Sequence, residues 1–146
     1  MDYKDTRISK IRDYLFGIIT TLTNNNEFQI NADMLSNDID NYSLDKIPTA
    51  STVRRLIGGT ELHRDVYSFR SRVAYSQDVI NNLLNVGFFE KFEALINSNN
   101  KKKIRPDITG IESISCLNSA TMNIADTNTA VFDIQLEITY RVDKEV

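Results

Sequence analysis

The stretch AVFDIQLEITYRV, residues 130–142, decides the fold of this chain. Every second position of it is apolar, and polar side chains fall between them; the apolar ones are Phe132, Ile134, Leu136, Ile138, Tyr140 and Val142. Successive side chains of a strand point to opposite faces, so this alternation predicts a strand with one buried and one exposed face. On a helix the same residues would be spread around the whole circumference. A strand of this length needs neighbouring strands and a cover for its apolar face.

The length of 146 residues predicts one domain, residues 1–146, which can bury about two thirds of its unfolded surface. Hydrophobic residues make up 41% of the chain and charged residues 25%, as in an ordinary globular protein. The longest apolar run, residues 14–19, is far shorter than the ~20 residues that a membrane helix needs. Residues 1–5 carry mixed charge and no apolar secretion segment, so we expect an intracellular origin.

The net charge of −3 argues against a protein that wraps DNA by charge alone. Four of the 17 basic residues nevertheless lie within one short segment: Lys101, Lys102, Lys103 and Arg105. This segment is either a solvated loop or a contact for DNA or an acidic partner. The adjacent Arg54 and Arg55 leave the same alternatives open. Strand alternation would send one of them inward, where a subunit contact would have to neutralise it.

Two helices are indicated by apolar residues at steps of three and four. The first spans residues 6–24, with the stripe Ile8, Ile11, Leu15, Ile18, Ile19 and Leu22. The second begins at Ser76, a capping residue, and carries the stripe Val79, Leu83, Val86, Phe88, Phe92, Leu95 and Ile96. Gly87 interrupts that stripe and predicts a kink or a break, because a glycine inside a helix costs about 1 kcal/mol.

The remaining segments favour strands. Short strands are expected at residues 28–30 and 42–47, and residues 52–57 and 62–73 form a hairpin around Gly58-Gly59. In its second arm Tyr67, Phe69, Ser71 and Val73 share one face, while Ser68, Arg70 and Arg72 share the other. Residues 108–125 predict a less regular strand with the inner residues Ile111, Ile114, Cys116, Ala120, Met122 and Ile124, followed by a turn at 126–129. This order predicts an α+β fold: an antiparallel or mixed sheet with helices packed on one face.

Catalytic and metal-binding patterns are not found in the sequence. His63 is the only histidine and is expected on the surface, and Cys116 is most simply a small core residue. Gly58-Gly59 fits neither of the glycine-rich frames that cradle phosphates. We therefore expect no enzyme, no cofactor and no metal site.

Four segments in order resemble a known family: residues 12–15 (RDYL), 42–49 (YSLDKIPT), 71–79 (SRVAYSQDV) leading into 85–92 (NVGFFEKF), and the closing strand. Together they resemble phage minor capsid or tail-terminator proteins, which occur in tailed phages and in phage-tail-like particles of Gram-positive bacteria. The resemblance extends over nearly the whole chain. It implies an α+β subunit that forms a homo-hexameric ring at the head-proximal end of a tail tube, stops tube growth, and joins the tube to the neck or head.

The partners that the resemblance implies are further copies of the chain, the tail-tube protein, a neck or head-completion protein, and DNA passing through the lumen, with no membrane. Such a protein belongs to a virion or phage-tail-like particle made in the bacterial cytoplasm. We expect subunit or tube contacts at Arg54, Arg55, Arg70 and Arg72, because arginine beside aromatic residues is typical of interfaces. The basic segment 101–105 is expected to project from a loop towards a protein neighbour.

Two alternative classes stay open at this point. One is another structural component of the same particle, such as a minor capsid, head-completion or tube protein; a long stacking hairpin would favour the tube. The other is a small binding module or enzyme whose site the sequence does not reveal. The ring size, the face that meets tube or head, and the choice between an infectious phage and a bacteriocin-like tail are also left open.

Overall fold

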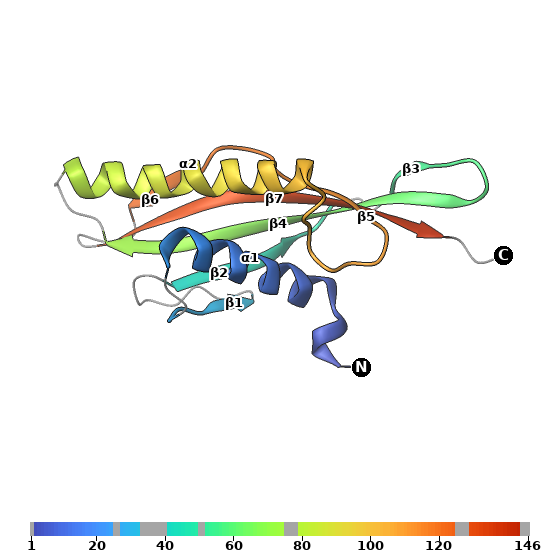
Figure 1. Ribbon diagram of the computed structural model, residues 1–146, viewed down its shortest axis with the longest axis horizontal. Helices are drawn as coiled ribbons and strands as arrows, with labels where there is room; N and C mark the ends of the chain where they lie inside the picture. Colours follow the sequence, from blue (N-terminus) through green and yellow to red (C-terminus); the bar gives the residue numbers. More distant parts are fainter. Residues whose placement is uncertain are drawn as a thin grey trace.

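The computed structural model describes residues 2–24, 27–32, 41–49, 52–74, 79–124 and 129–143 (Figure 1). These residues form two α-helices packed against a seven-stranded mixed sheet, which confirms the predicted α+β class. The helical elements are η1 (Tyr3–Asp5), α1 (Arg7–Thr23) and α2 (Val79–Lys101). The strands are β1 (Ile30–Ala32), β2 (Asn41–Ile47), β3 (Thr52–Arg55), β4 (Thr60–Ala74), β5 (Ile111–Cys116), β6 (Thr121–Ile124) and β7 (Thr129–Asp143).

Two long antiparallel strands, β4 and β7, form the centre of the sheet and run along the long axis of the molecule (Figure 1). They pair from Thr60 opposite Asp143 to Ala74 opposite Thr129. Strands β2 and β3 flank β4, while β5 and β6 flank β7. The short strand β1 pairs with β2 in parallel, and this pair makes the sheet mixed.

The inner face of the sheet carries the predicted alternation of β7. Its apolar residues from Phe132 to Tyr140 are buried, whereas the polar residues between them are half-buried. Tyr67 of β4 lies opposite Leu136, and Phe69 lies opposite Ile134. Arg70 and Arg72 are on the other face of β4, so the predicted alternation of this arm is also confirmed.

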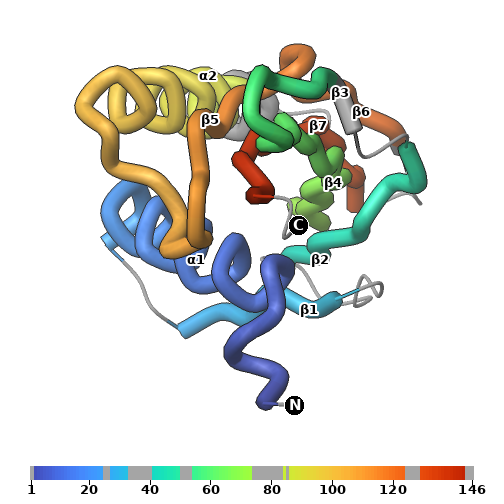
Figure 2. The backbone as a smooth tube through the Cα atoms, turned by 90° about the vertical axis from the view of Figure 1, so that its right-hand side faces the viewer, coloured from blue at the N-terminus to red at the C-terminus, as the bar shows by residue number. Residues whose placement is uncertain are grey.

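Both helices lie side by side on the same side of β4 and β7, as Figure 2 shows in a view along these strands. The core residues that they contribute are Ile11, Leu15, Ile18 and Ile19 from α1, and Phe89, Phe92 and Ile96 from α2. A chain of aromatic contacts joins the two helices across the sheet: Phe16–Phe28, Phe28–Tyr42, Tyr42–Phe69 and Phe69–Phe92, with ring centroids 4.5 to 5.4 Å apart. Contacts of this kind contribute about 0.5–1.5 kcal/mol each beyond the area they bury.

The ends of α1 follow from two polar residues. The hydroxyl of Thr6 accepts a hydrogen bond from the backbone N–H of Ser9 at 3.3 Å, and Asn24 closes the helix in the left-handed conformation with φ 53°. Both features satisfy backbone groups that a helix end leaves unpaired. The prediction of a helix over residues 6–24 is therefore confirmed.

Helix α2 differs from the prediction, because it continues through Gly87 without a break. A Cβ atom at this position would meet nothing within 4 Å, so the glycine weakens the helix without marking a close contact. One glycine costs a helix only about 1 kcal/mol, and the packing of Phe89 and Phe92 holds the part of α2 that follows it on the sheet. The cap predicted at Ser76 lies outside the described residues.

The predicted strand over residues 108–125 is in fact two strands, β5 and β6. Between them the side-chain oxygen of Asn118 accepts from the N–H of Gln135 at 2.9 Å, in the place of a backbone carbonyl. Met122 was predicted on the inner face but is 44% exposed. It lies opposite Phe132 on a short strand at the edge of the sheet, where few side chains pack over it. The turn expected at 126–129 lies largely outside the described residues.

None of the helices in the described ranges combines the length and the apolar character that crossing a bilayer requires.

Candidate functional site

The inner face of the sheet changes character towards one end of β4 and β7. There it presents Glu61, His63 and Asp65 of β4, which lie opposite Val142, Tyr140 and Ile138 of β7. Figure 1 shows that β3, its turn and the adjoining parts of β4 and β7 extend past both helices. We call this region the hairpin end, and define it as residues 52–65 and 138–143.

Asp65 is the centre of a buried cluster where the hairpin end meets the core, with a side chain only 2% exposed. Arg7 of α1 donates from Nε to its Oδ2 at 2.8 Å, and the Tyr67 hydroxyl donates to the same oxygen at 3.1 Å. The other oxygen, Oδ1, accepts from the Tyr140 hydroxyl at 3.3 Å and lies 3.7 Å from Nζ of Lys46. One carboxylate thus ties together α1, β2, β4 and β7.

The electrostatics of this cluster favour its ionised form. Burial alone would raise the pKa of Asp65, but the hydrogen bond and charge of Arg7, with the charge of Lys46, outweigh it and lower the pKa. Burial raises the pKa of Tyr67 and Tyr140, and the negative charge of Asp65 raises both further. The cluster therefore holds a carboxylate, two cations and two neutral hydroxyls, which suits a structural node and leaves no group poised for proton transfer.

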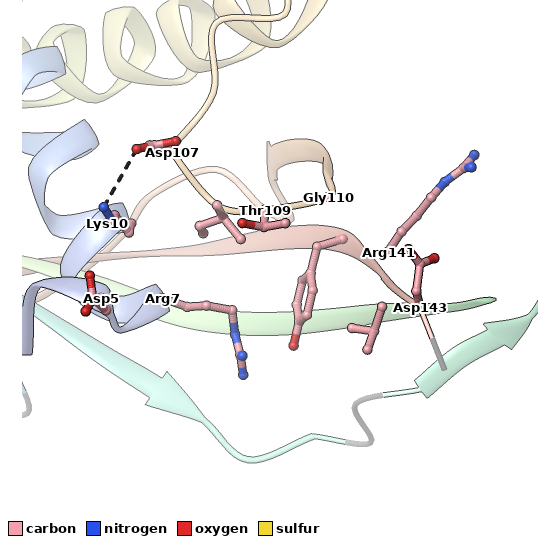
Figure 3. A pocket seen from close by; sticks show the side chains of 11 residues that line it. Asp5, Arg7, Lys10, Asp107, Thr109, Gly110, Arg141 and Asp143 are labelled. Carbon is pink, nitrogen blue, oxygen red and sulfur yellow. Dashed lines mark ion pairs between the residues drawn. The ribbon is translucent and has the colours of Figure 1, made fainter. Parts of the chain in front are cut away.

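An open cleft of about 920 Å³ lies beside the cluster (Figure 3). Its walls come from η1 and the first residues of α1, from the loop 107–110, and from the end of β7 at 140–143. Gly110 fixes the approach of the loop to β7. It has a φ of +78°, and a Cβ there would lie 2.5 Å from the carbonyl oxygen of Arg141. The N–H of Arg141 donates to the Gly110 carbonyl at 2.8 Å.

Two carboxylates of the cleft have no cationic partner in the described part of the chain. Each cation pairs with a carboxylate: Arg7 with Asp65, Lys10 with Asp107 at 3.7 Å, and Arg141 with Glu112. Asp5 and Asp143 also line the cleft and have no cationic partner among the residues that the structure describes. Among the described residues, these two carboxylates are the groups of the cleft that a cation from another molecule could pair with.

The tip of the hairpin is a tight turn between β3 and β4. Gly58 and Gly59 have φ values of 92° and 90°, which only glycine adopts readily, and this confirms the predicted hairpin. Ile57 beside them is fully exposed.

The paired arginines of β3 point to opposite faces, as strand alternation predicts. Arg55 lies on the inner side opposite Glu61, and its Nε is 3.1 Å from Oε2 of that residue. Glu61 of the same chain thus neutralises the arginine for which the sequence suggested a subunit contact. Arg54 is exposed opposite Leu62 and has no acidic partner within the described ranges.

Arg70 and Arg72 lie on the outer face of β4, away from the hairpin tip. Arg70 pairs with Asp45 of β2 at 2.5 Å, and Arg72 donates to the hydroxyl of Thr129 of β7 at 3.1 Å. The structure therefore does not bring the four arginines singled out in the sequence into one surface. Only Arg54 and Arg55 belong to the hairpin end.

The basic segment 101–105 lies at the C-terminal end of α2. Lys101, Lys102 and Lys103 are exposed, and Lys103 ends the helix in the left-handed conformation with φ 62°. Arg105 instead folds back, donating from Nε and Nη2 to the side-chain and backbone oxygens of Asn100 at 2.8 and 2.9 Å. Cations here also complement the negative end of the helix dipole.

The groups that most often serve in catalysis have structural surroundings. His63 is half-buried rather than on the surface, with Nε2 3.1 Å from Glu61 and its ring 5.7 Å from that of Tyr140. Burial, and then the charge of Glu93, raises the pKa of Cys116 to about 12, so its thiol is protonated and unreactive at neutral pH. No three metal-ligating side chains come together in the described part of the chain.

Sequence reasoning missed the Asp65 cluster and the cleft. One signal was available: Asp65 occupies an inner position, two residues before Tyr67, on a strand whose inner face is otherwise apolar at 67 and 69. A charged residue at such a position needs buried partners. Comparison of the sequence with protein-family models and with curated proteins finds no match.

Proposed function

We propose that this chain is a ring-forming tail terminator, which caps the head-proximal end of a tail tube and joins it to the neck or head of a tailed phage or phage-tail-like particle. The sequence resemblance supports this proposal. Its segments 12–15, 42–49 and 130–142 coincide with α1, β2 and β7, elements that build the sheet and its cover. The resemblance therefore concerns the framework of the fold as well as its surface.

The observation that carries the proposal is the hairpin end. A β-ribbon that extends past both helices displays a fully exposed Ile57 and an arginine without an acidic partner in the described ranges. An isolated subunit gains no stability from an isoleucine at a hairpin tip. Apolar residues flanked by arginine are typical of protein–protein interfaces. A paired ribbon that projects from a well-packed body suits a subunit that works by assembly.

The exposed lysines fit a second contact of the same particle. In a ring, Lys101, Lys102 and Lys103 recur in every subunit and form a circle of positive charge. A cationic circle in the lumen would retard passing DNA, because phosphate contacts add with each neutralised charge. The proposal therefore assigns these lysines to an acidic surface of the tube, neck or head-completion protein, with DNA making only passing contact.

A tail-tube protein is the second candidate, and the projecting hairpin favours it, since a tube protein needs an element that reaches the next ring. The two candidates differ in the assembly that they form. A tube protein polymerises without a fixed end, whereas a terminator forms a closed ring and stops growth.

Native mass spectrometry of the purified chain, alone and mixed with tail tubes of the particle that encodes it, tests the proposal. We expect one closed ring with a fixed copy number, either free or on tube ends. Open-ended polymers would favour the tube protein. A chain that stays monomeric and leaves tube ends bare would contradict both.

A further inference from the structure

The hairpin end presents two different surfaces side by side. Thr60, which directly follows the turn, pairs with Asp143, which lines the cleft. The tip and the cleft are therefore neighbours at one end of the molecule. The tip cannot enter the cleft of its own chain, because the ladder between β3, β4 and β7 holds the ribbon extended along the strand direction.

The tip has side chains suited to entering a pocket of another molecule. Ile57 is fully exposed, and Arg54 carries a charge that no carboxylate of the described chain neutralises. The two glycines make the turn narrow, since neither has a side chain that would widen it. A narrow tip with one apolar and one cationic group needs a hollow with an apolar wall and carboxylates that have no cationic partner.

The cleft offers those features. Ile108, Tyr140 and Val142 provide apolar wall, and Asp5 and Asp143 provide carboxylates that lack a cationic partner within the described residues. Its volume of about 920 Å³ is at the upper end of the range of ligand-sized pockets, so a tight turn can enter it. The two carboxylates match the charge of Arg54, and the apolar wall matches Ile57.

We propose that two copies of this chain pair through their hairpin ends, with the tip of each copy seated in the cleft of the other. Ile57 lies on the apolar wall, and Arg54 pairs with Asp143. The contact is reciprocal because tip and cleft are neighbours, so a half-turn about an axis between them exchanges the two. Such an isologous contact is complete with two copies. Each tip and each cleft residue occurs in it twice, so one substitution changes two contacts of the pair.

The pairing goes beyond the proposed function and does not require it. A ring repeats the hairpin end in every subunit, and if these ends lie on a rim, reciprocal pairing joins two rings face to face. The free protein then covers the rim that would otherwise contact the tube or neck. If the chain forms no ring, the same contact joins two single subunits.

Sedimentation velocity over a range of protein concentrations tests the pairing. We expect the wild-type chain to double in mass as the concentration rises. Ile57→Asp should raise the dissociation constant roughly tenfold or more, since two apolar tips are lost per pair. Leu84→Asp replaces a leucine that is 66% exposed on α2 and provides a matched control that should pair normally.

Charge reversal gives the sharper test, because it can be rescued. Arg54→Asp and Asp143→Arg should each weaken pairing, and the double variant should recover it to within about threefold. Circular dichroism should show all variants folded. Normal pairing of Ile57→Asp and Arg54→Asp would overturn the proposal while leaving a ring intact. A wild-type protein that never doubles would also overturn it, and a single closed ring in that experiment would still support the proposed function. Doubling of single subunits without any ring would support the pairing, and the proposed function would then be contradicted only if the chain also left tube ends bare.

Discussion

Strands β4 and β7 have two different roles on the same face of the sheet. One role belongs to the middle of the two strands, around Tyr67 and Leu136, and the other belongs to the hairpin end. In the middle, Tyr67 lies opposite Leu136, and both are buried under the helices. At the hairpin end, His63 lies opposite Tyr140 and Glu61 opposite Val142. The guanidinium of Arg7 is the last contact from α1, 4.8 Å from the centre of the Tyr140 ring, and the ribbon then extends past both helices. The boundary falls at Asp65, where the first residues of α1 supply Arg7 instead of an apolar side chain.

This difference shows that the type of residue on the inner face depends on whether a helix packs over that position, and not on strand alternation alone. Where helices cover the sheet, the inner residues are apolar and hold the fold together. Where the cover ends, charged residues with partners take their place, and beyond them the ribbon is open for contact with another molecule. Stability and association are thus separated along one pair of strands, and substitutions at the two ends should have different consequences.

The largest expected effect is at the middle. Leu136→Asp places an unpaired charge in the core and should lower the free energy of unfolding by about 4 kcal/mol or more. Glu137→Gln, one residue along on the opposite face, removes only the ion pair with Arg64 and should cost less than about 1 kcal/mol. Urea denaturation of the two variants measures both values. Similar denaturation curves would mean that Leu136 does not lie on the buried face of β7.

The next effect is at the boundary. Asp65→Asn keeps the shape but removes the charge that pairs with Arg7 and Lys46, and should cost roughly 2–3 kcal/mol at neutral pH, because those cations are partly exposed.

The cost of Asp65→Asn should also depend on pH. Because the pKa of Asp65 is lowered by folding, its stabilisation is complete above the unfolded value of about 3.9 and is lost as the pH falls through the folded pKa. Denaturation of both proteins at a series of pH values measures the difference, which should shrink in acid. If the difference in the free energy of unfolding stays constant down to low pH, Asp65 does not stabilise the protein through its charge.

A smaller effect is expected at the cleft. Gly110→Ala strains a left-handed residue and pushes a Cβ against the Arg141 carbonyl, which should cost about 1–3 kcal/mol. Gly87→Ala in the open face of α2 should instead stabilise the protein by about 0.5–1 kcal/mol. Thermal unfolding of the pair gives opposite shifts if loop 107–110 is held as closely to β7 as the structure shows; equal shifts would argue against that contact.

The smallest effect on stability is at the tip. Ile57→Ser should change the free energy of unfolding by less than about 0.5 kcal/mol, because the side chain is already fully exposed. Calorimetry of the dilute, unpaired protein measures this value. A loss of more than 1 kcal/mol, by the same scale, would mean that the tip helps to hold the subunit together and would remove the contrast between the two ends.

Local patterns in the sequence predicted the middle well. The alternation of β7 depends only on neighbouring residues, and so do the bounds of the first helix near Thr6 and Asn24. The Gly58-Gly59 turn is the one part of the hairpin end that was predicted in the same way. The continuity of α2 was missed because a single glycine costs a helix only about 1 kcal/mol, which is not enough by itself to end it.

The hairpin end was harder to predict, because its contacts join distant segments. The partners of Asp65 come from residues 7, 46, 67 and 140, and the cleft exists only because Gly110 lets a loop approach β7. The break between β5 and β6 depends on an asparagine side chain that replaces a backbone carbonyl. None of these contacts produces a periodic pattern in the sequence, so periodicity does not predict them.

The most direct test of the central claim is electron microscopy of the intact particle at a resolution that traces side chains. The account predicts a closed ring of this chain at the head-proximal end of the tail tube, with the helices and the middle of the sheet as the body of each subunit and the hairpin ends in contact with a neighbouring component. A particle in which the chain lies elsewhere, or in which Ile57 and Arg54 face open solvent in every subunit, would contradict it.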